Sequence, residues 1–84
     1  MHLYVAYLGG PMPEGQMGEG HEVVAVVADG EVDARAKAKA KWNGYGRSHV
    51  DALQRIESVD GFRIDLVATG SADRVDNELF GYNE

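Results

Sequence analysis

Cysteine is absent from this chain of 84 residues. Its absence excludes disulfides, zinc sites built on thiolates and thiol nucleophiles. Long apolar runs are missing as well. The first apolar stretch, Leu3 to Leu8, is too short for the hydrophobic region of a signal peptide, and no basic segment precedes it. No segment approaches the length of a membrane span, so we expect a cytoplasmic protein without a membrane partner.

Positive charge is also scarce, because the chain has 8 Lys and Arg residues and 14 Asp and Glu residues. The formal net charge of -6 argues against general affinity for nucleic acid. We predict a single domain over residues 1–70 and an acidic tail over residues 71–84. A domain of this size buries only about three-fifths of its unfolded surface, so an exposed apolar face weakens a small stability margin. No cofactor is expected.

The first two predicted strands are apolar on both faces. In Leu3 to Leu8 and again in Val23 to Ala28, every position is apolar or aromatic, so neither strand offers a polar side to water. The segment between them, Gly9 to Gly20, holds five glycines and two prolines in twelve positions. This loop exceeds the usual hairpin connection of about two to five residues. We interpret it as a flexible hairpin tip, with a binding loop as the alternative.

A helix is predicted from Glu31 to Trp42, because alanine, lysine and arginine are strong helix formers and weak strand formers. Acidic residues in the first turn and lysines in the last turn match the helix dipole. The expected apolar face is narrow and consists of Val32, Ala36 and Ala40. We expect Trp42 to fill the core beside these small residues.

A turn at Asp60-Gly61 joins the last two predicted strands. A two-residue turn would place the charged side chains of Arg55 and Glu57 on the apolar face. A three-residue loop over 59–61 instead sets Ser58 opposite Phe62 and keeps these charges outside. We therefore predict the three-residue loop.

The predicted fold is α+β in the order β-β-α-β-β, with a four-stranded, largely antiparallel sheet and one helix packed on one face. A helix about 10 to 12 Å wide covers only part of four strands spaced by about 4.8 Å. The other face is bare, and an apolar patch of this kind indicates an interface. The predicted register places Leu53 and Val67 on this face. We therefore expect a homodimer with these two residues at its interface.

Three stretches resemble a known bacterial family. They are Leu3 to Gly10 (LYVAYLGG), His21 to Asp29 (HEVVAVVAD), and Trp42 to Leu66, with W-x-G, H-x-D and VDGFRIDL. Together they resemble the domain of unknown function DUF1543, for which no activity is established. The resemblance implies one or two domain copies per protein. The tail from Glu78 to Asn83 looks like the truncated start of a second copy. Packing of tandem copies through their sheets implies a homodimer for a single-copy chain.

Two of the three histidines are predicted to meet. His2 and His21 open antiparallel neighbours and therefore lie at opposite ends of the sheet. A strand-helix-strand crossover brings His49 to the same end as His21, where Glu22 and Asp51 also converge. Two imidazoles and a carboxylate form the ligand set of a divalent metal or an acid-base pair. The alternative is a group of surface or interface polar residues, and catalytic residues stay unassigned.

A basic stretch offers a third type of site. Its members are Arg35, Lys37, Lys39, Lys41 and Arg47. Such a cluster is able to bind RNA phosphate or an anionic protein. However, alternate positions spread around a helix rather than forming one stripe, so we expect a solvated face and regard nucleic acid as an unlikely partner.

We conclude that the sequence predicts a small binding or interaction module that forms a homodimer through its sheet face, rather than an enzyme. One alternative is a metal-assisted hydrolase or acid-base site at His21, His49 and Asp51. The other is RNA or anionic-partner binding by the basic helix. Binding of a small molecule is a further alternative.

Overall fold

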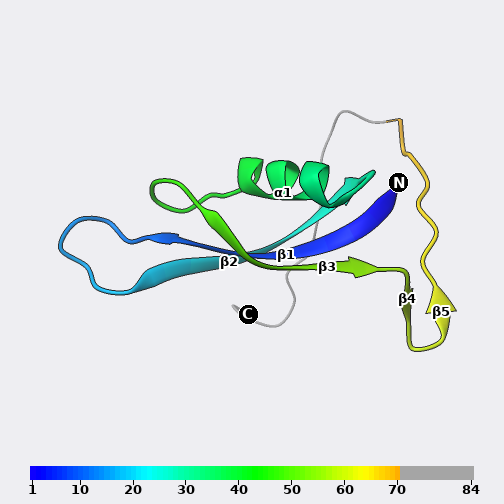
Figure 1. Ribbon diagram of the computed structural model, residues 1–84, viewed down its shortest axis with the longest axis horizontal. Helices are drawn as coiled ribbons and strands as arrows, with labels where there is room; N and C mark the ends of the chain where they lie inside the picture. Colours follow the sequence, from blue (N-terminus) through cyan, green and yellow to red (C-terminus); the bar gives the residue numbers. More distant parts are fainter. Residues whose placement is uncertain (71–84) are drawn as a thin grey trace, which may run out of the picture.

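The computed structural model describes residues 1–70, and the predicted second-copy remnant in residues 71–84 lies outside the described residues. The elements are β1 (His2–Pro11), β2 (Glu19–Ala28), α1 (Glu31–Ala40), β3 (His49–Ile56), β4 (Ser58–Val59) and β5 (Phe62–Arg63) (Figure 1). The predicted α+β class is confirmed. Among residues 1–70, no helix is long and apolar enough to cross a membrane.

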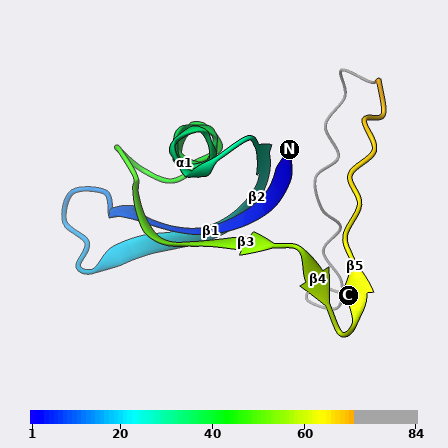
Figure 2. The ribbon, with the colours of Figure 1, turned by 45° about the vertical axis from the view of Figure 1, so that its right-hand side comes forward.

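The main sheet has three strands in the order β2-β1-β3, and β1 is antiparallel to both neighbours. The prediction of one four-stranded sheet is wrong. β4 and β5 form a separate two-stranded sheet beyond the end of β3, where the chain bends at Glu57 (Figure 2). The fourth predicted strand therefore does not lie along β3.

The turn between β4 and β5 also differs from the prediction. Val59 pairs with Phe62 and Ser58 with Arg63, so the turn has two residues and not three. Asp60 and Gly61 have φ angles of 54° and 83°, and two successive left-handed residues form the type I′ turn that suits a tight hairpin. The sequence argument against the shorter turn is the burial of Arg55 and Glu57, yet both residues are exposed. The four paired residues are all exposed, so this cost does not arise.

The core lies between the sheet and α1. Its buried members are Tyr4, Ala6, Leu8, Val24, Val26, Ala28, Ala34 and Ala38, and the partly buried Trp42, Val50 and Leu53 pack against them. The predicted core role of Trp42 is confirmed. The predicted helix face is wrong, because Ala34 and Ala38 face the sheet while Val32 is 84% exposed. Alanines alternate from 34 to 40, so several helix orientations offer a stacked pair, and the pattern alone does not choose between them.

Two lysines fasten α1 to the outer edge of β2. Lys37 Nζ donates to the Val27 carbonyl at 2.8 Å, and Lys41 Nζ donates to the Ala25 carbonyl at 2.7 Å. Both carbonyls belong to the edge strand of the sheet. Unpaired edge groups attract other strands, and charged side chains are a common way to block them. The lysines thus protect this edge of the sheet.

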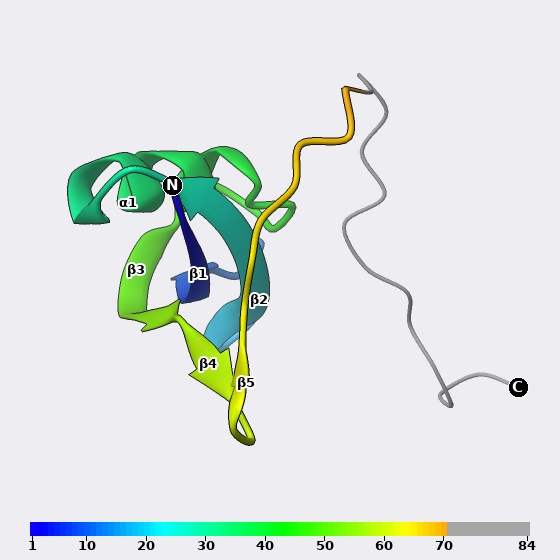
Figure 3. The ribbon, with the colours of Figure 1, turned by 90° about the vertical axis from the view of Figure 1, so that its right-hand side faces the viewer.

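Within residues 1–70, the only helix is α1, and it packs on one face of the main sheet (Figure 3). In β1 and β2, the buried residues alternate with residues that are half-buried or exposed, including Tyr7 and Val23. We call this surface the open face and define it by Leu3, Val5, Tyr7, Val23, Ala25, Val27, Ala52 and Ile56. The predicted lack of cover on one side of the first two strands is therefore present in the structure.

Candidate metal centre

One end of the sheet brings both candidate histidines together. In β1, Gly9 is the register partner of His21 on one side and of His49 on the other. The predicted approach of the two histidines is confirmed. His2 pairs with Ala28 at the opposite end of the strand, as predicted. The sheet register therefore places two imidazoles across a single glycine.

Asp51 lies at the same end of the sheet, in a β-bulge of β3. Tyr7 pairs with Ala52 and Leu8 pairs with Val50, so Asp51 is an extra residue in the ladder. Such a bulge redirects side chains, and it frequently occurs beside functional sites. Asp51 lies beside His49. Because of the extra residue, the side chain of Leu53, two positions after Asp51, faces the helix side and packs against the core.

Glu19 is the fourth polar side chain at this end. Glu19 is not among the predicted metal ligands, because the predicted loop from Gly9 to Gly20 includes it, whereas β2 begins at this residue. Glu22, which the sequence suggested, lies elsewhere. It accepts hydrogen bonds from the Asn43 backbone N–H at 3.0 Å and from Asn43 Nδ2 at 3.2 Å. Glu22 therefore holds the segment that follows α1.

The polar atoms of these four residues form one cluster. His49 Nε2 lies 2.9 Å from Asp51 Oδ1 and 3.8 Å from Glu19 Oε2. His21 Nδ1 lies 3.9 Å from Asp51 Oδ2, and His21 Nε2 lies 4.0 Å from Glu19 Oε1. One ligand atom from each of Glu19, His49 and Asp51 falls within 4.8 Å of the others. Each carboxylate thus contacts both imidazoles.

Gly9 provides the space around which these atoms meet. A Cβ atom at this position would lie 2.8 Å from Asp51 Oδ2, 3.0 Å from His49 Nε2 and 3.2 Å from Glu19 Oε1. The backbone there is ordinary strand, so glycine is not required by a left-handed conformation. The missing side chain leaves room for the cluster. We call this space the Gly9 cradle.

An aromatic ring orients one of the imidazoles. The rings of Tyr7 and His21 stack with centroids 5.3 Å apart and planes inclined by 7°. The side chains of Glu19, His21 and His49 are between 43% and 51% exposed, and that of Asp51 is 34% exposed. The cluster is therefore accessible from solvent on the open-face side.

A family model matches residues 16–66 of the chain, and its description is a domain of unknown function, DUF1543. The chain belongs to the DUF1543 family. Neither the curated proteins nor the solved structures gave a match. The family segment of this DUF1543 domain contains Glu19, His21, His49 and Asp51, while Gly9 precedes it.

The other predicted site residues of this DUF1543 domain lie apart from the cluster. Leu53 packs against the core on the helix side of the sheet, which differs from its predicted place on the uncovered face. Val67 follows β5 and is 84% exposed, and its part in a dimer interface stays a prediction. In the basic stretch, Arg35 pairs with Glu31 at 2.9 Å, and Lys37 lies 3.5 Å from Asp33. Lys41 binds the β2 edge. Lys39 and Arg47 are further basic positions of this stretch, and anion binding by its five residues stays a prediction.

Proposed function

We propose that this domain binds a divalent transition-metal ion at the Gly9 cradle. The observation that carries the proposal is the convergence of three ligand atoms, from Glu19, His49 and Asp51, on the space left by a missing Cβ. Imidazole nitrogen with carboxylate oxygen suits zinc, manganese or iron(II) better than calcium or magnesium, which prefer oxygen ligands throughout. The proposed role is metal binding by side chains that the sheet register holds in place.

The ligand atoms need only a small contraction to bind an ion. Tetrahedral ligands at about 2.1 Å from zinc lie roughly 3.4 Å from one another. The three atoms lie within 4.8 Å, and their side chains are exposed enough to move. His49 Nε2 and Asp51 Oδ1 already lie 2.9 Å apart, so a small movement of these side chains is enough to place both atoms on one ion.

His21 determines whether the centre is closed or open. Three protein ligands leave a fourth position for water, which is the arrangement of catalytic zinc sites, whereas four protein ligands give a structural site. His21 stands beside both carboxylates and is held against Tyr7. The metal-assisted hydrolase predicted from the sequence requires the open arrangement, and it remains a prediction.

Metal binding is tested by calorimetric titration of the untagged protein with zinc chloride and manganese chloride. We expect one ion per chain, and a loss of affinity of about tenfold or more in Asp51→Asn and His49→Ala, because each removes a ligand. His2→Ala is the matched control, since His2 lies at the far end of β1. Equal affinities in all four proteins, or loss of binding only in His2→Ala, would reject the proposal.

A homodimer through the open face is the second candidate function. Tyr7 and Val23 remain 41% and 59% exposed on this apolar surface, which α1 does not cover. Patches of this kind mark interaction sites on small proteins. If two open faces pack together, Val23→Lys should lower the mass seen by light scattering from two chains to one. Val32→Lys, at an exposed position of α1, is the matched control and is expected to leave the mass unchanged.

A further inference from the structure

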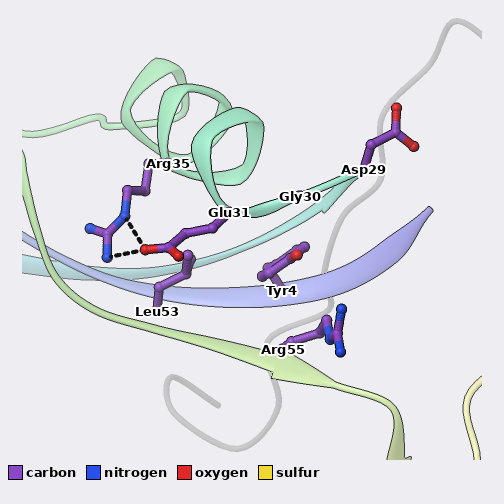
Figure 4. A pocket seen from close by; sticks show the side chains of 7 residues that line it. All are labelled: Tyr4, Asp29, Gly30, Glu31, Arg35, Leu53 and Arg55. Atoms are coloured by element: carbon purple, nitrogen blue, oxygen red, sulfur yellow. Dashed lines mark hydrogen bonds and ion pairs between the residues drawn. The ribbon is translucent and has the colours of Figure 1, made fainter.

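A cleft opens between the start of α1 and the strands β1 and β3 (Figure 4). Its volume is about 450 Å³, which falls within the roughly 300 to 1,000 Å³ of small-molecule sites. We call it the α1 cleft. Tyr4 and Leu53 line it from the sheet, and both pack in or against the core on the helix side. The α1 cleft is therefore distinct from the Gly9 cradle and from the open face.

Tyr4 brings a buried hydroxyl group to this cleft. The residue is only 5% exposed. Within residues 1–70, no hydrogen bond joins the Tyr4 hydroxyl to another group of the protein. Every fully enclosed polar side-chain atom of these residues has a partner, so the Tyr4 hydroxyl reaches the cleft that the residue lines. Buried tyrosine hydroxyls usually bind a partner, and here the place for that partner is the cleft.

The start of α1 supplies further hydrogen-bond donors. The first N–H groups of a helix have no partner inside the helix, and they carry the positive end of its dipole. The N-cap residue is Gly30, and no side chain of the described residues caps it. Gly30 and Glu31 line the cleft together with Tyr4. An anionic group in the α1 cleft therefore meets the beginning of the helix and a phenol hydroxyl.

Arg55 adds positive charge to the same space. It is the register partner of Tyr4 in the ladder of β1 and β3, and it lines the cleft. Arg55 Nη2 lies 2.8 Å from Glu57 Oε2. A guanidinium has five N–H donors, so this contact leaves others that can reach a ligand. The donors of the cleft thus come from three elements, α1, β1 and β3.

We propose that the α1 cleft binds a small carboxylate with an apolar body. The carboxylate group accepts hydrogen bonds from Tyr4 and from the start of α1, while Leu53 contacts the apolar part. One negative charge fits better than two, because Asp29 and Glu31 also line the cleft and repel a dianion. Arg35 and Arg55 balance these two carboxylates without an excess. This site is independent of both metal binding and packing through the open face.

Benzoate is the probe that tests the proposal. The protein is first treated with a chelating resin, so that no metal ion at the Gly9 cradle holds the probe. Benzoate is then titrated into isotope-labelled protein, and the amide signals are followed by NMR. We expect saturable shifts of the Glu31, Val32 and Asp33 signals. Benzamide, which lacks the charge, and inorganic phosphate, which carries a second one, should bind about tenfold more weakly or less.

Two variants remove the proposed contacts without disturbing the fold. Tyr4→Phe should weaken benzoate binding by about tenfold, because a hydrogen bond to a charged group is lost. Its thermal midpoint should be equal or higher, since the hydroxyl has no partner within the described residues. Tyr45→Phe, at an exposed tyrosine, is the matched control. Gly30→Ser should also weaken binding, because a serine oxygen caps the helix N–H groups and competes with the probe. A Cβ at Gly30 meets no atom within 4 Å, so the variant fits.

The outcomes decide between this site and its alternatives. Equal affinity for benzoate in Tyr4→Phe and Tyr45→Phe would overturn the proposal, as would shifts confined to residues of the Gly9 cradle. Benzamide binding as tightly as benzoate would show that the cleft selects only an apolar ring. Phosphate binding as tightly as benzoate would show that a second charge is tolerated. Either result contradicts a site for a singly charged carboxylate, and so does the absence of any saturable shift.

Discussion

At the scale of single residues, Gly9 has the strongest influence on the candidate metal centre. Three polar atoms surround the position of its missing Cβ at 2.8 to 3.2 Å. Gly10, the next residue, also has no room for a side chain, but there the neighbour is the Trp42 ring, because a Cβ would lie 2.6 Å from Trp42 Cζ2. Adjacent residues of a strand point to opposite faces, so one glycine serves the polar cluster and the other serves the core.

Gly9→Ala is expected to weaken zinc binding by about tenfold or more while changing the free energy of unfolding by less than about 1 kcal/mol. The added methyl group displaces the ends of exposed side chains, which move easily, but it occupies the space of the ion. Gly10→Ala should show the opposite pattern, with normal zinc affinity and a loss of about 1 to 3 kcal/mol from overpacking. Calorimetry and urea unfolding of both variants measure the two effects. Unchanged zinc affinity in Gly9→Ala would contradict the cradle.

At the scale of elements, the helix shows that a small side chain can determine how closely two layers pack. Ala34 and Ala38 are fully buried against the sheet, one turn apart. Lys37 and Lys41 follow them around the helix and reach the β2 edge. The orientation of α1 therefore satisfies two requirements together, close packing of its alanines and protection of the sheet edge.

Ala38→Leu should destabilise the protein by about 1 to 3 kcal/mol, because three extra carbon atoms enter a tightly packed layer. Ala36→Leu, at an exposed position of the same helix, should change stability by about 0.5 kcal/mol or less. Urea unfolding monitored by circular dichroism compares the two. If Ala36→Leu were the more damaging variant, the helix face predicted from the sequence would be right and the observed orientation wrong.

The sequence predicted the elements better than their faces. Apolar runs and alanine-rich composition were sufficient for β1, β2 and α1, and direction alone brought His21 and His49 together. The predicted hairpin register kept the charge of Arg55 away from the helix and so put Leu53, two residues earlier, on the uncovered face, whereas both residues pair with core positions of β1 on the helix side. The extra residue Asp51 is a second feature of β3 that was not predicted. A bulge depends on how two strands fit, and sequence alternation in one strand does not reveal it.

At the scale of the whole molecule, the main question is how a domain of 84 residues covers its apolar surface. In the described residues 1–70, α1 covers one face of the main sheet and its lysines protect the β2 edge, while no helix packs on the open face. Small domains have little stability to spare for such exposure. Association of two copies through the open face would cover this surface.

The thermal midpoint should therefore rise with protein concentration. For chains that fold as dimers, each tenfold increase in concentration favours the folded state by about 1.4 kcal/mol per dimer. For a domain of this size, that corresponds to a shift of roughly 3 to 5 °C. Calorimetric scans over a hundredfold range of concentration measure it.

Two single variants then locate the interface. Loss of the shift in Val23→Lys, with the shift retained in Val32→Lys, supports packing through the open face, because Val23 belongs to that face and Val32 is exposed on α1. The reverse pattern, or a constant midpoint in the unaltered protein, contradicts the open-face dimer.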